Sequence, residues 1–338
     1  MNLQDRIETL VLLGKQLRQP QALPNATIHH ACYTNLWFTP QNIQTALTAI
    51  ATQFLNRREL ETWLSAYPAI AVAQIPKTVG LVMAGNIPLV GWHDFMCVFV
   101  CGYKAMVKLS SKDEALFTHL LQLMVQINPD VQNYVAIVQQ LKDFDAVIAT
   151  GSNNSARYFE YYFGKLPHII RKNRSSVAIL TGSETPEEIT RLGNDIFEYF
   201  GLGCRNVSKL MVPKGYDFAR FLSLLEPFGK VMQHNKYKNN YDYHYSVFLL
   251  NKQLNYASDF LILQENPLVA SPVSVVHYEF YTSAQDLQNK LAQQQDQIQC
   301  ITAAQPTGTA IPFGSAQQPR LWDYADGVDT MQFLTAGW

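Results

Sequence analysis

The segment at residues 78–88 reads TVGLVMAGNIP, an apolar stretch that ends in a tight polar loop. Its valines and leucine favour a buried β-strand at 78–83, and the Gly-Asn and Ile-Pro pairs that follow mark a turn. The pattern of strand, loop and helix then recurs, with further strands expected at 105–109, 134–138 and 146–149 and helices at 88–101, 113–126 and 154–163. Strands that alternate with helices imply right-handed crossovers and a largely parallel, doubly wound sheet. The sequence therefore predicts a Rossmann-like α/β domain whose ligands bind at the carboxyl ends of its strands.

The rest of the chain divides into a helical start and a second α/β unit. Residues 3–67 have the periodicity of helices, and Thr39 followed by Pro40 marks one helix start by its capping side chain and first-turn proline. Thr185 followed by Pro186 and two glutamates marks another helix start, in the second unit. That unit is expected to hold strands at 176–180, 209–212, 246–250 and 273–278 and a helix at 284–294. The predicted segments are 1–72, 73–175 and 176–338.

The composition narrows the classes of partner. The 338 residues are 48% apolar and 16% charged, with a net charge of -1. A nucleic-acid binder would carry a basic excess, so no nucleic acid is expected as a partner. No apolar run is long enough to cross a bilayer, and the polar amphipathic start differs from a secretion signal, so a cytoplasmic protein is expected. The cysteines and histidines show no metal-ligand spacing, and no metal site is expected.

Cys204 is the strongest candidate for a nucleophile. It lies in Gly201-Leu202-Gly203-Cys204-Arg205, where two glycines leave the backbone open and a cation follows directly. A neighbouring cation favours the thiolate, which is the form in which a thiol attacks. By itself the pattern favours a small core residue, because most single cysteines serve packing.

Asn86 is placed to stabilise an oxyanion. It follows the strand expected at 78–83, on a tight loop where a side-chain amide can donate to developing negative charge. Loss of one such donor costs about 100- to 1000-fold in rate. The alternative is that Asn86 caps the helix expected at 88–101.

Polar residues at two other strand ends suit a nucleotide cofactor. Lys108, Ser110 and Ser111 form a partly cationic cradle without a carboxylate, which favours a 2′-phosphate and hence NADP over NAD. Gly151 and Ser152 open the helix expected at 154–163, whose first N–H groups can hold a phosphate. The alternatives are a solvated lysine at a strand end and an ordinary strand-to-helix turn. The chain has no Gly-x-Gly-x-x-Gly and no Walker lysine motif, which disfavours a standard Rossmann dehydrogenase and a P-loop enzyme.

The stretch at 234–245 reads HNKYKNNYDYHY, too polar for a core and too aromatic for a plain linker. We interpret it as a loop that lines a substrate or CoA channel, since tyrosine combines an apolar body with a polar end. Its two lysines would then meet CoA phosphates. A packed surface loop is equally compatible with this composition.

Five motifs in chain order resemble the aldehyde dehydrogenase superfamily, and more closely its short branch of fatty-acyl-CoA reductases of the bacterial luminescence (LuxC) type. The likeness runs from about Thr78 to the C-terminus. The motifs are AGNIP at 84–88, KLSS at 108–111, ATGS at 149–152, GLGC at 201–204 and PFGS at 312–315. They resemble the family's Pro-Trp-Asn-Phe-Pro, Lys-Pro-Ser-Glu, Phe-Thr-Gly-Ser, Gly-Gln-x-Cys and Pro-Phe-Gly-Gly. Five matches in order are much more specific than any one of them.

The resemblance implies an aldehyde-dehydrogenase-like fold with two α/β domains and an N-terminal helical segment at 1–72. The cofactor domain would be 73–175, and 176–338 would be the catalytic domain with its C-terminal tail. The implied roles are nucleophile for Cys204, oxyanion donor for Asn86, and cofactor contact for Lys108, Ser110, Ser111, Gly151 and Ser152. Superfamily members commonly pair, so a homodimer is the default expectation, although this shorter chain would have an altered oligomerisation hairpin and tail.

Two departures from the family pattern are informative. Where hydrolytic members carry Glu-Leu-Gly-Gly-Lys, this chain has Ile170-Arg171-Lys172-Asn173-Arg174, so the glutamate that activates water is missing. That absence suits acylating members, in which a thiol exchanges with the acyl-enzyme. The Glu-x-Phe-Gly-Pro motif is echoed only by Glu265-Asn266-Pro267, which makes Glu265 a candidate contact for the cofactor ribose. The alternative for Glu265 is an exposed loop acid.

The resemblance thus implies reduction of an acyl-CoA, with a fatty acyl group expected, to the aldehyde by NADPH through a thioester on Cys204. An acyltransferase or thioesterase-like enzyme that uses the same cysteine without hydride transfer is one alternative. A non-catalytic subunit that presents an acyl group is the other. The sequence leaves open the acyl chain length and any need for a partner protein.

Overall fold

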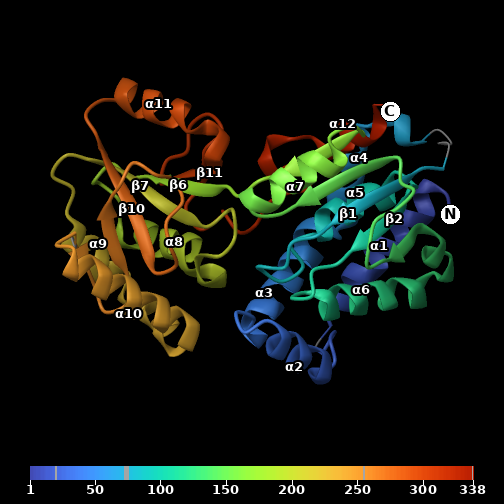
Figure 1. Cartoon of the computed structure of the whole chain (residues 1–338), viewed down its shortest axis with the longest axis horizontal. Helices are drawn as coiled ribbons and strands as arrows, with labels where there is room; N and C mark the ends of the chain where they lie inside the picture. Colours follow the sequence, from blue (N-terminus) through green and yellow to red (C-terminus); the bar gives the residue numbers. More distant parts are fainter. Residues whose placement is uncertain (20, 72–75, 254–255, 337) are drawn as a thin grey trace. The chain divides into compact units, whose positions relative to one another are not determined.

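The computed structural model describes residues 1–19, 21–71, 76–253, 256–336 and 338. It contains two compact units (Figure 1): unit 1 comprises Met1–Asn173 and Pro319–Trp338, and unit 2 comprises Arg174–Gln318. Each unit is built on its own sheet. The segment boundary predicted between residues 72 and 73 lies outside the described residues.

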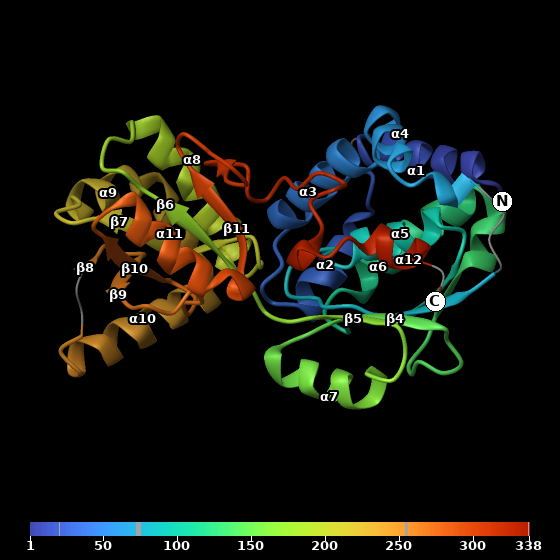
Figure 2. The ribbon, with the colours of Figure 1, turned by 90° about the horizontal axis from the view of Figure 1, so that it is seen from above.

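Sheet A of unit 1 has the strand order β3-β2-β1-β4-β5, and all paired neighbours run parallel. The strands are β1 (Thr78–Val82), β2 (Lys104–Lys108), β3 (Val135–Ile137), β4 (Ala146–Thr150) and β5 (His168–Arg171). Helices α5 (Trp92–Val100) and α6 (Glu114–Ile127) follow β1 and β2, whereas α7 (Asn153–Phe163) follows β4 and covers the other face (Figure 2). The order reverses between β1 and β4, so the predicted doubly wound, Rossmann-like arrangement is confirmed.

The N-terminal helices and the C-terminal tail share one apolar core with sheet A. Thr39 caps α3 by accepting a hydrogen bond from the Asn42 N–H at 3.1 Å, as its position before a proline predicts. The tail, predicted as part of the segment 176–338, belongs to unit 1, because Leu321, Met331 and Leu334 are buried in this core. The helices are α1 (Leu3–Leu17), α2 (Asn25–Thr34), α3 (Pro40–Ala49), α4 (Arg57–Ser65) and α12 (Thr330–Thr335), with the short helices η1 (Ile50–Phe54), η2 (Pro68–Ala71), η3 (Pro129–Tyr134) and η7 (Ala325–Gly327).

Helix α5 begins four residues later than predicted, at Trp92 rather than residue 88. Leu89 has a left-handed backbone with φ of 57°, which interrupts a right-handed helix. The N-cap of α5 is Gly91, and no side chain caps the helix. The residues between β1 and α5 therefore form an extended loop, which leaves more room for a site at the strand end.

Sheet B of unit 2 has the strand order β12-β11-β6-β7-β10-β9-β8, and all its pairs are parallel except β8 with β9. The strands are β6 (Ser175–Ile179), β7 (Val207–Pro213), β8 (Tyr256–Ala257), β9 (Ile262–Glu265), β10 (Val275–Tyr281), β11 (Ile298–Ala303) and β12 (Ile311–Pro312). The helices are α8 (Pro186–Phe197), α9 (Phe218–Leu224), α10 (Asn235–Leu250) and α11 (Ala284–Gln293), with η4 (Glu198–Gly201), η5 (Glu226–Gln233) and η6 (Gln295–Gln297). Thr185 and Glu188 form the predicted capping box of α8.

Two predictions for residues 234–250 are wrong, because α10 (Asn235–Leu250) replaces both the expected loop and the expected strand. His234 caps the helix, and Tyr237 and Tyr241 lie one turn apart on its buried side. Their hydroxyls donate to the backbone oxygens of Phe260, at 2.9 Å, and Ser258, at 2.5 Å. The tyrosine rings thus pack in the core while their hydroxyls are hydrogen-bonded. They form an apolar stripe at helical spacing, which was not recognised because the rest of the segment is polar.

Among the described residues, no helix is both long enough and apolar enough to span a membrane. Across the same residues, no three His, Cys, Asp or Glu side chains gather in an arrangement that would hold a metal ion.

Candidate active site

Asn86 and the cofactor candidates at 108–111 and 151–152 lie at the ends of three neighbouring strands of sheet A. Val82 at the end of β1 is in register with Lys108 on one side and with Ala149 on the other. The loops that carry Asn86, Ser110 and Gly151 therefore leave the sheet at one edge. That edge includes the point between β1 and β4 where the strand order reverses, which is where ligands bind in open α/β sheets.

The loop that carries Asn86 is held from two sides. A Cβ on Gly85 would lie 2.6 Å from the Ser110 Oγ, so only glycine allows this approach. The Asn35 side chain donates to the Gly85 oxygen at 2.9 Å. Asn86 itself is exposed at the tip of the loop. The alternative that Asn86 caps the following helix is wrong, because α5 begins six residues later, at Trp92.

Asp113 is a site residue that the sequence analysis missed. Its Oδ2 accepts a hydrogen bond from the Leu89 N–H at 2.7 Å and so holds the far end of the Asn86 loop. Burial raises the pKa of Asp113 well above its usual range, against the hydrogen bond from Leu89, which lowers it. The only sequence signal was its place in the run Lys108 to Asp113, directly after the expected cofactor residues.

The cofactor candidates lie on the surface of this edge. Lys108 is the exposed last residue of β2, and the Lys112 N–H donates to the Ser110 Oγ at 3.3 Å within the following turn. Ser152 is the N-cap of α7 and accepts from the Ser155 N–H at 3.2 Å, so its hydroxyl already serves the helix start. A Cβ on Gly151 would lie 2.8 Å from the Phe159 ring, so this glycine also allows α7 to pack on β4.

Cys204 lies on the turn between η4 and β7 in unit 2, and its side chain is half-buried. The chain reverses after α8 through three consecutive left-handed residues, Tyr199, Phe200 and Gly201, with φ of 49°, 59° and 77°. Non-glycine residues adopt this backbone only when the surrounding structure holds it. The turn is also anchored by the Ser176 hydroxyl, which donates to the Cys204 oxygen at 3.1 Å. The thiol is therefore presented by a rigid turn at the amino end of β7.

Asn206 organises this turn, and the sequence analysis missed it. Its buried side-chain amide donates to three backbone oxygens at the end of α8, at 3.0 Å to Asp195, 3.4 Å to Ile196 and 2.8 Å to Glu198. Its Oδ1 accepts from the Gly203 N–H at 2.8 Å. One side chain thus ties the helix end to the residue before Cys204.

We expect Asn206→Ala to loosen the Cys204 turn, because three carbonyls lose their donor and the Gly203 N–H loses its acceptor. A cost of about 2 kcal/mol for this network corresponds to about 30-fold faster hydrogen exchange of the amides at 201–206. The matched control is Asn194→Ala, an exposed position on α8 with an expected effect within about 0.5 kcal/mol. Equal exchange in the two variants would show that Asn206 does not hold the turn.

A second buried side chain, Asp195, ties the PFGS motif to α8. Its two carboxylate oxygens accept from the Gly314 N–H at 2.7 Å and the Ala316 N–H at 2.9 Å. The Arg205 Nε donates to the Ala316 oxygen at 2.5 Å from the other side. The residue after Cys204 and the segment that follows the motif at 312–315 therefore meet in unit 2, and the Arg205 side chain serves this contact.

Asp195 should make the stability of unit 2 depend on pH. Burial raises the pKa of Asp195 to about 6, although the Gly314 and Ala316 N–H groups act in the opposite direction. Since the unfolded value is about 3.9, the contribution of this group to stability is complete below about pH 4 and is lost as the pH rises through about 6. We expect a loss of up to about 3 kcal/mol over that window, absent in Asp195→Asn. Urea titrations read by hydrogen-exchange mass spectrometry of unit 2 peptides measure it, and the same pH slope in the variant would contradict the assignment.

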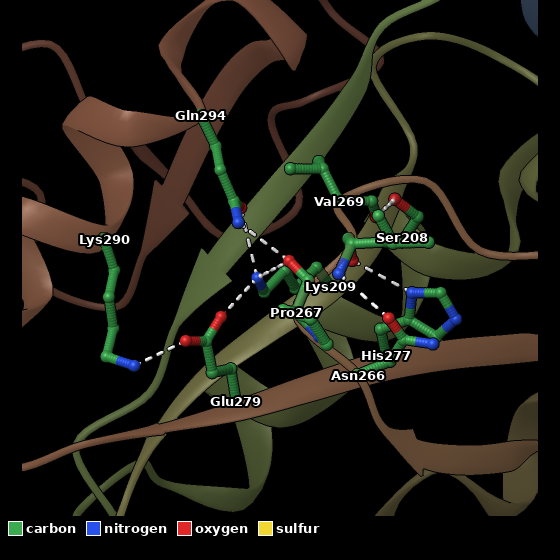
Figure 3. A network of polar contacts seen from close by, with 10 residues as sticks. Ser208, Lys209, Asn266, Pro267, Val269, His277, Glu279, Lys290 and Gln294 are labelled. Atoms are coloured by element: carbon green, nitrogen blue, oxygen red, sulfur yellow. Dashed lines mark hydrogen bonds and ion pairs between the residues drawn. The ribbon is translucent and has the colours of Figure 1, made fainter.

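Glu265 is not brought near Cys204 within unit 2. It is the last residue of β9, in register with Tyr278 and Leu210, whereas Cys204 precedes the start of β7. The neighbouring Pro267 oxygen belongs to a polar network (Figure 3), where it accepts from the buried Lys209 Nζ at 2.6 Å. The segment 265–267 thus has a structural contact of its own, and the role of Glu265 in cofactor binding stays a prediction.

Arg171, in the segment that replaces the water-activating glutamate motif, is a structural cation. It is buried and pairs with Asp94 at 2.7 Å, and it also donates to Thr330 Oγ1 at 2.8 Å and to the Ala325 oxygen at 2.6 Å. These contacts tie β5 to α5 and to the C-terminal tail. A buried ion pair at this position supplies no base for activating water.

Comparison with solved structures shows a shared fold over most of the chain. An oxidoreductase from Marinobacter aquaeolei matches with a TM-score of 0.67 at 11% identity, over 90% of this chain and 73% of that one. Betaine aldehyde dehydrogenase from Staphylococcus aureus, in complex with NAD+, matches with 0.63 at 12% identity, over 94% and 72%. The His387Ala mutant of the propionaldehyde dehydrogenase from the Clostridium phytofermentans fucose utilisation bacterial microcompartment matches with 0.62 at 9% identity, over 95% and 82%.

The fold is that of the aldehyde dehydrogenases. The predicted fold class is therefore confirmed, with sheet A as its Rossmann-like part. No family model and no curated protein matches the sequence. At this low identity, the aldehyde dehydrogenase likeness concerns the fold, and activity has to be argued from the site.

Proposed function

We propose that this protein reduces an acyl-CoA thioester to the aldehyde with NADPH through an acyl-enzyme on Cys204. The observation that carries the proposal is the half-buried Cys204 on a locked turn of an aldehyde dehydrogenase fold. Segment 170–174 contains no carboxylate to activate water, and its Arg171 is held by Asp94 in a buried ion pair, which supports the acylating branch.

In this proposal the Cys204 thiolate attacks the thioester carbonyl, and the new C–S bond replaces the bond to CoA, which leaves as the thiol after taking a proton. The Cys204 backbone N–H donates to the oxyanion, and the part of Asn86 as a second donor stays a prediction. When bound, NADPH supplies the hydride. The C–S bond to Cys204 then breaks, which releases the aldehyde and restores the thiolate. The balance is one acyl-CoA, one NADPH and one proton to one aldehyde, one CoA and one NADP+.

The charges at the carboxyl end of sheet A favour NADPH, whose 2′-phosphate is negative, as the cofactor of the proposed reaction. Residues 108–112 contain two lysines and no carboxylate, and the nearest acid, Asp113, is buried and bonded to Leu89. One structural neighbour is described in complex with NAD+, so NADH is the matched comparison. The test is oxidation of NADPH and of NADH at 340 nm with acyl-CoAs from acetyl to palmitoyl, with the aldehyde trapped and identified. If Cys204 is acylated but neither cofactor is oxidised, the protein transfers acyl groups without reducing them. If Cys204 is not acylated and neither cofactor is oxidised, the protein has a non-catalytic role.

We expect Lys108→Ala to raise the KM for NADPH about 10- to 100-fold, because a charge-assisted hydrogen bond to phosphate is worth about 1.5–3 kcal/mol. The KM for NADH should change little. Lys104→Ala is the matched control, since Lys104 is an exposed lysine at the amino end of the same strand. Steady-state kinetics with both cofactors measure the effect, and equal effects of the two variants would remove Lys108 from the site.

A further inference from the structure

Sheet B has its own reversal of strand order, between β6 and β11. The chain leads from β6 through α8 to β7 on one side, and later returns through α11 to place β11 on the other side of β6. Helices α8 and α11 lie on opposite faces of the sheet (Figure 1). In open α/β sheets, the crevice outside the carboxyl ends of the two strands at such a point is the usual ligand site.

A pocket of about 660 Å³ occupies this crevice. Ile179 and Ile301 line it from the two strands, and Leu287 and Leu291 line it from α11. This volume is within the range of small-molecule sites, which are largely apolar with a few polar groups. The pocket lies at the carboxyl ends of β6 and β11, whereas Cys204 precedes the amino end of β7, so the two are separate features of unit 2.

The charge of the pocket is negative. Glu184 and Glu188 line it, and no lysine, arginine or histidine does. Glu184 is 2% exposed, and its carboxylate accepts from the N–H groups of Thr181, at 2.5 Å, and Gly182, at 3.1 Å. Glu188 accepts from the Thr185 N–H at 2.8 Å. Within the part of the chain that the structure describes, neither carboxylate has an ion-pair partner. The Arg220 guanidinium donates to the Glu184 backbone oxygen at 2.9 Å, but Arg220 does not line the pocket.

We propose that this pocket binds a small organic cation with an apolar body. The apolar walls remove the body from water, and the two carboxylates, which form no ion pair among the described residues, favour positive charge at the polar end. An anion such as a phosphate ester would meet the same field with the opposite sign, and none of the lining side chains could neutralise it. The site is therefore distinct in chemistry from the nucleotide edge of sheet A.

The test is a charge series on one scaffold: benzylamine, benzyl alcohol and phenylacetate. Binding is followed by methyl NMR of protein with labelled leucine and isoleucine, in which Leu287, Leu291 and Ile301 report on the pocket. Benzylamine should shift these methyls at about 2- to 5-fold lower concentration than benzyl alcohol, the range expected of a partly exposed ion pair. Phenylacetate should bind most weakly.

Two glutamines on α11 provide the matched variants. Gln288 lines the pocket and Gln285 does not, and both are exposed, so Gln288→Trp and Gln285→Trp make the same change on the same helix. Gln288→Trp should weaken benzylamine binding at least about 10-fold, and Gln285→Trp should leave it within about 2-fold. The cavity-filling variant Ala304→Trp gives an independent loss of binding. Iodoacetamide labelling of Cys204 at the wild-type rate confirms that each variant is folded.

The proposal is overturned if no probe shifts the pocket methyls, if phenylacetate binds as tightly as benzylamine, or if Gln288→Trp and Gln285→Trp bind benzylamine equally. Loss of acyl-CoA reduction does not bear on it, because the readout is binding at the pocket and needs neither NADPH nor an acyl group.

Discussion

Cys204→Ala should lose acyl-enzyme formation completely and acyl-CoA-dependent NADPH oxidation by at least about a thousand-fold, since removal of a catalytic nucleophile leaves only binding and electrostatic terms. The variant keeps the Asn206 network, which uses only backbone atoms of its neighbours, so the turn should remain in place. Intact-protein mass spectrometry after mixing with an acyl-CoA measures acylation, and absorbance at 340 nm measures turnover.

The other cysteines supply the control. Burial raises the pKa of Cys97 well above its usual range and that of Cys101 to about 12, so neither thiol is ionised near neutral pH. Cys300 is half-buried like Cys204, and its Sγ lies 3.0 Å from the Ser176 hydroxyl that also donates to the Cys204 oxygen. Cys300→Ala should therefore keep both acylation and turnover. Acyl transfer that survives Cys204→Ala but not Cys300→Ala would move the nucleophile to Cys300.

Lys209→Met should destabilise unit 2 by about 3 kcal/mol. Lys209 is 1% exposed, and its Nζ donates to Glu279 at 2.5 Å, to the Pro267 oxygen at 2.6 Å and to Gln294 at 3.1 Å (Figure 3). Methionine fills a similar volume but removes the donor to one Glu279 oxygen and to the Gln294 side-chain oxygen, whereas the Pro267 oxygen keeps the Gln294 Nε2 donor at 2.8 Å. Breaking one side of a buried ion pair is costly. Burial alone would raise the pKa of Glu279, but hydrogen bonds from two lysines outweigh it and hold that pKa below its usual value.

Lys290→Met is the matched control, because it removes the second cation from the same carboxylate. The Lys290 side chain is 27% exposed and donates to the other oxygen of Glu279 at 2.5 Å, so its loss should cost no more than about 1 kcal/mol. Hydrogen-exchange mass spectrometry of peptides from β7 and β10 measures both effects. All five tryptophans belong to unit 1, so their fluorescence should be unchanged in both variants. Equal losses in the two variants would show that burial does not set the strength of this network.

Strands β1 to β4 of sheet A were predictable because each is a short apolar run followed by a turn. The strand expected at 78–83 is β1 (Thr78–Val82), and the one expected at 146–149 is β4 (Ala146–Thr150). The strand β5 (His168–Arg171) was missed, since the run 170–174 carries three basic residues. Arg171 is accepted in the sheet because Asp94 pairs with it, which no local pattern reveals. Helix α10 was also predicted wrongly because tertiary contacts accept its polar groups. Its buried tyrosine rings pack in the core, and their hydroxyls donate to backbone oxygens of a distant segment.

The site likewise contains residues that could be predicted from the sequence and residues that could not. Cys204, Asn86 and the residues at 108–111 were predictable because glycines, an amide, a lysine and hydroxyls follow strand or helix ends in a recognisable order. Asn206, Asp195 and Asp113 were not, since their partners are backbone atoms of segments that are distant in sequence or that have no side-chain signal. A buried polar side chain that satisfies the backbone looks like any surface residue in a sequence.

The sequence by itself determined the alternation of strands and helices, the doubly wound sheet at 78–150 and the positions of the thiol and amide, because hydrophobic period and turn chemistry are local properties. Only the tertiary structure decided that the tail packs with unit 1, that α11 and β11 enclose an acidic pocket beside β6, and that buried Asn206 and Asp195 hold the Cys204 turn and the PFGS motif. Those outcomes depend on burial and on hydrogen bonds between segments that the chain brings together only when it folds.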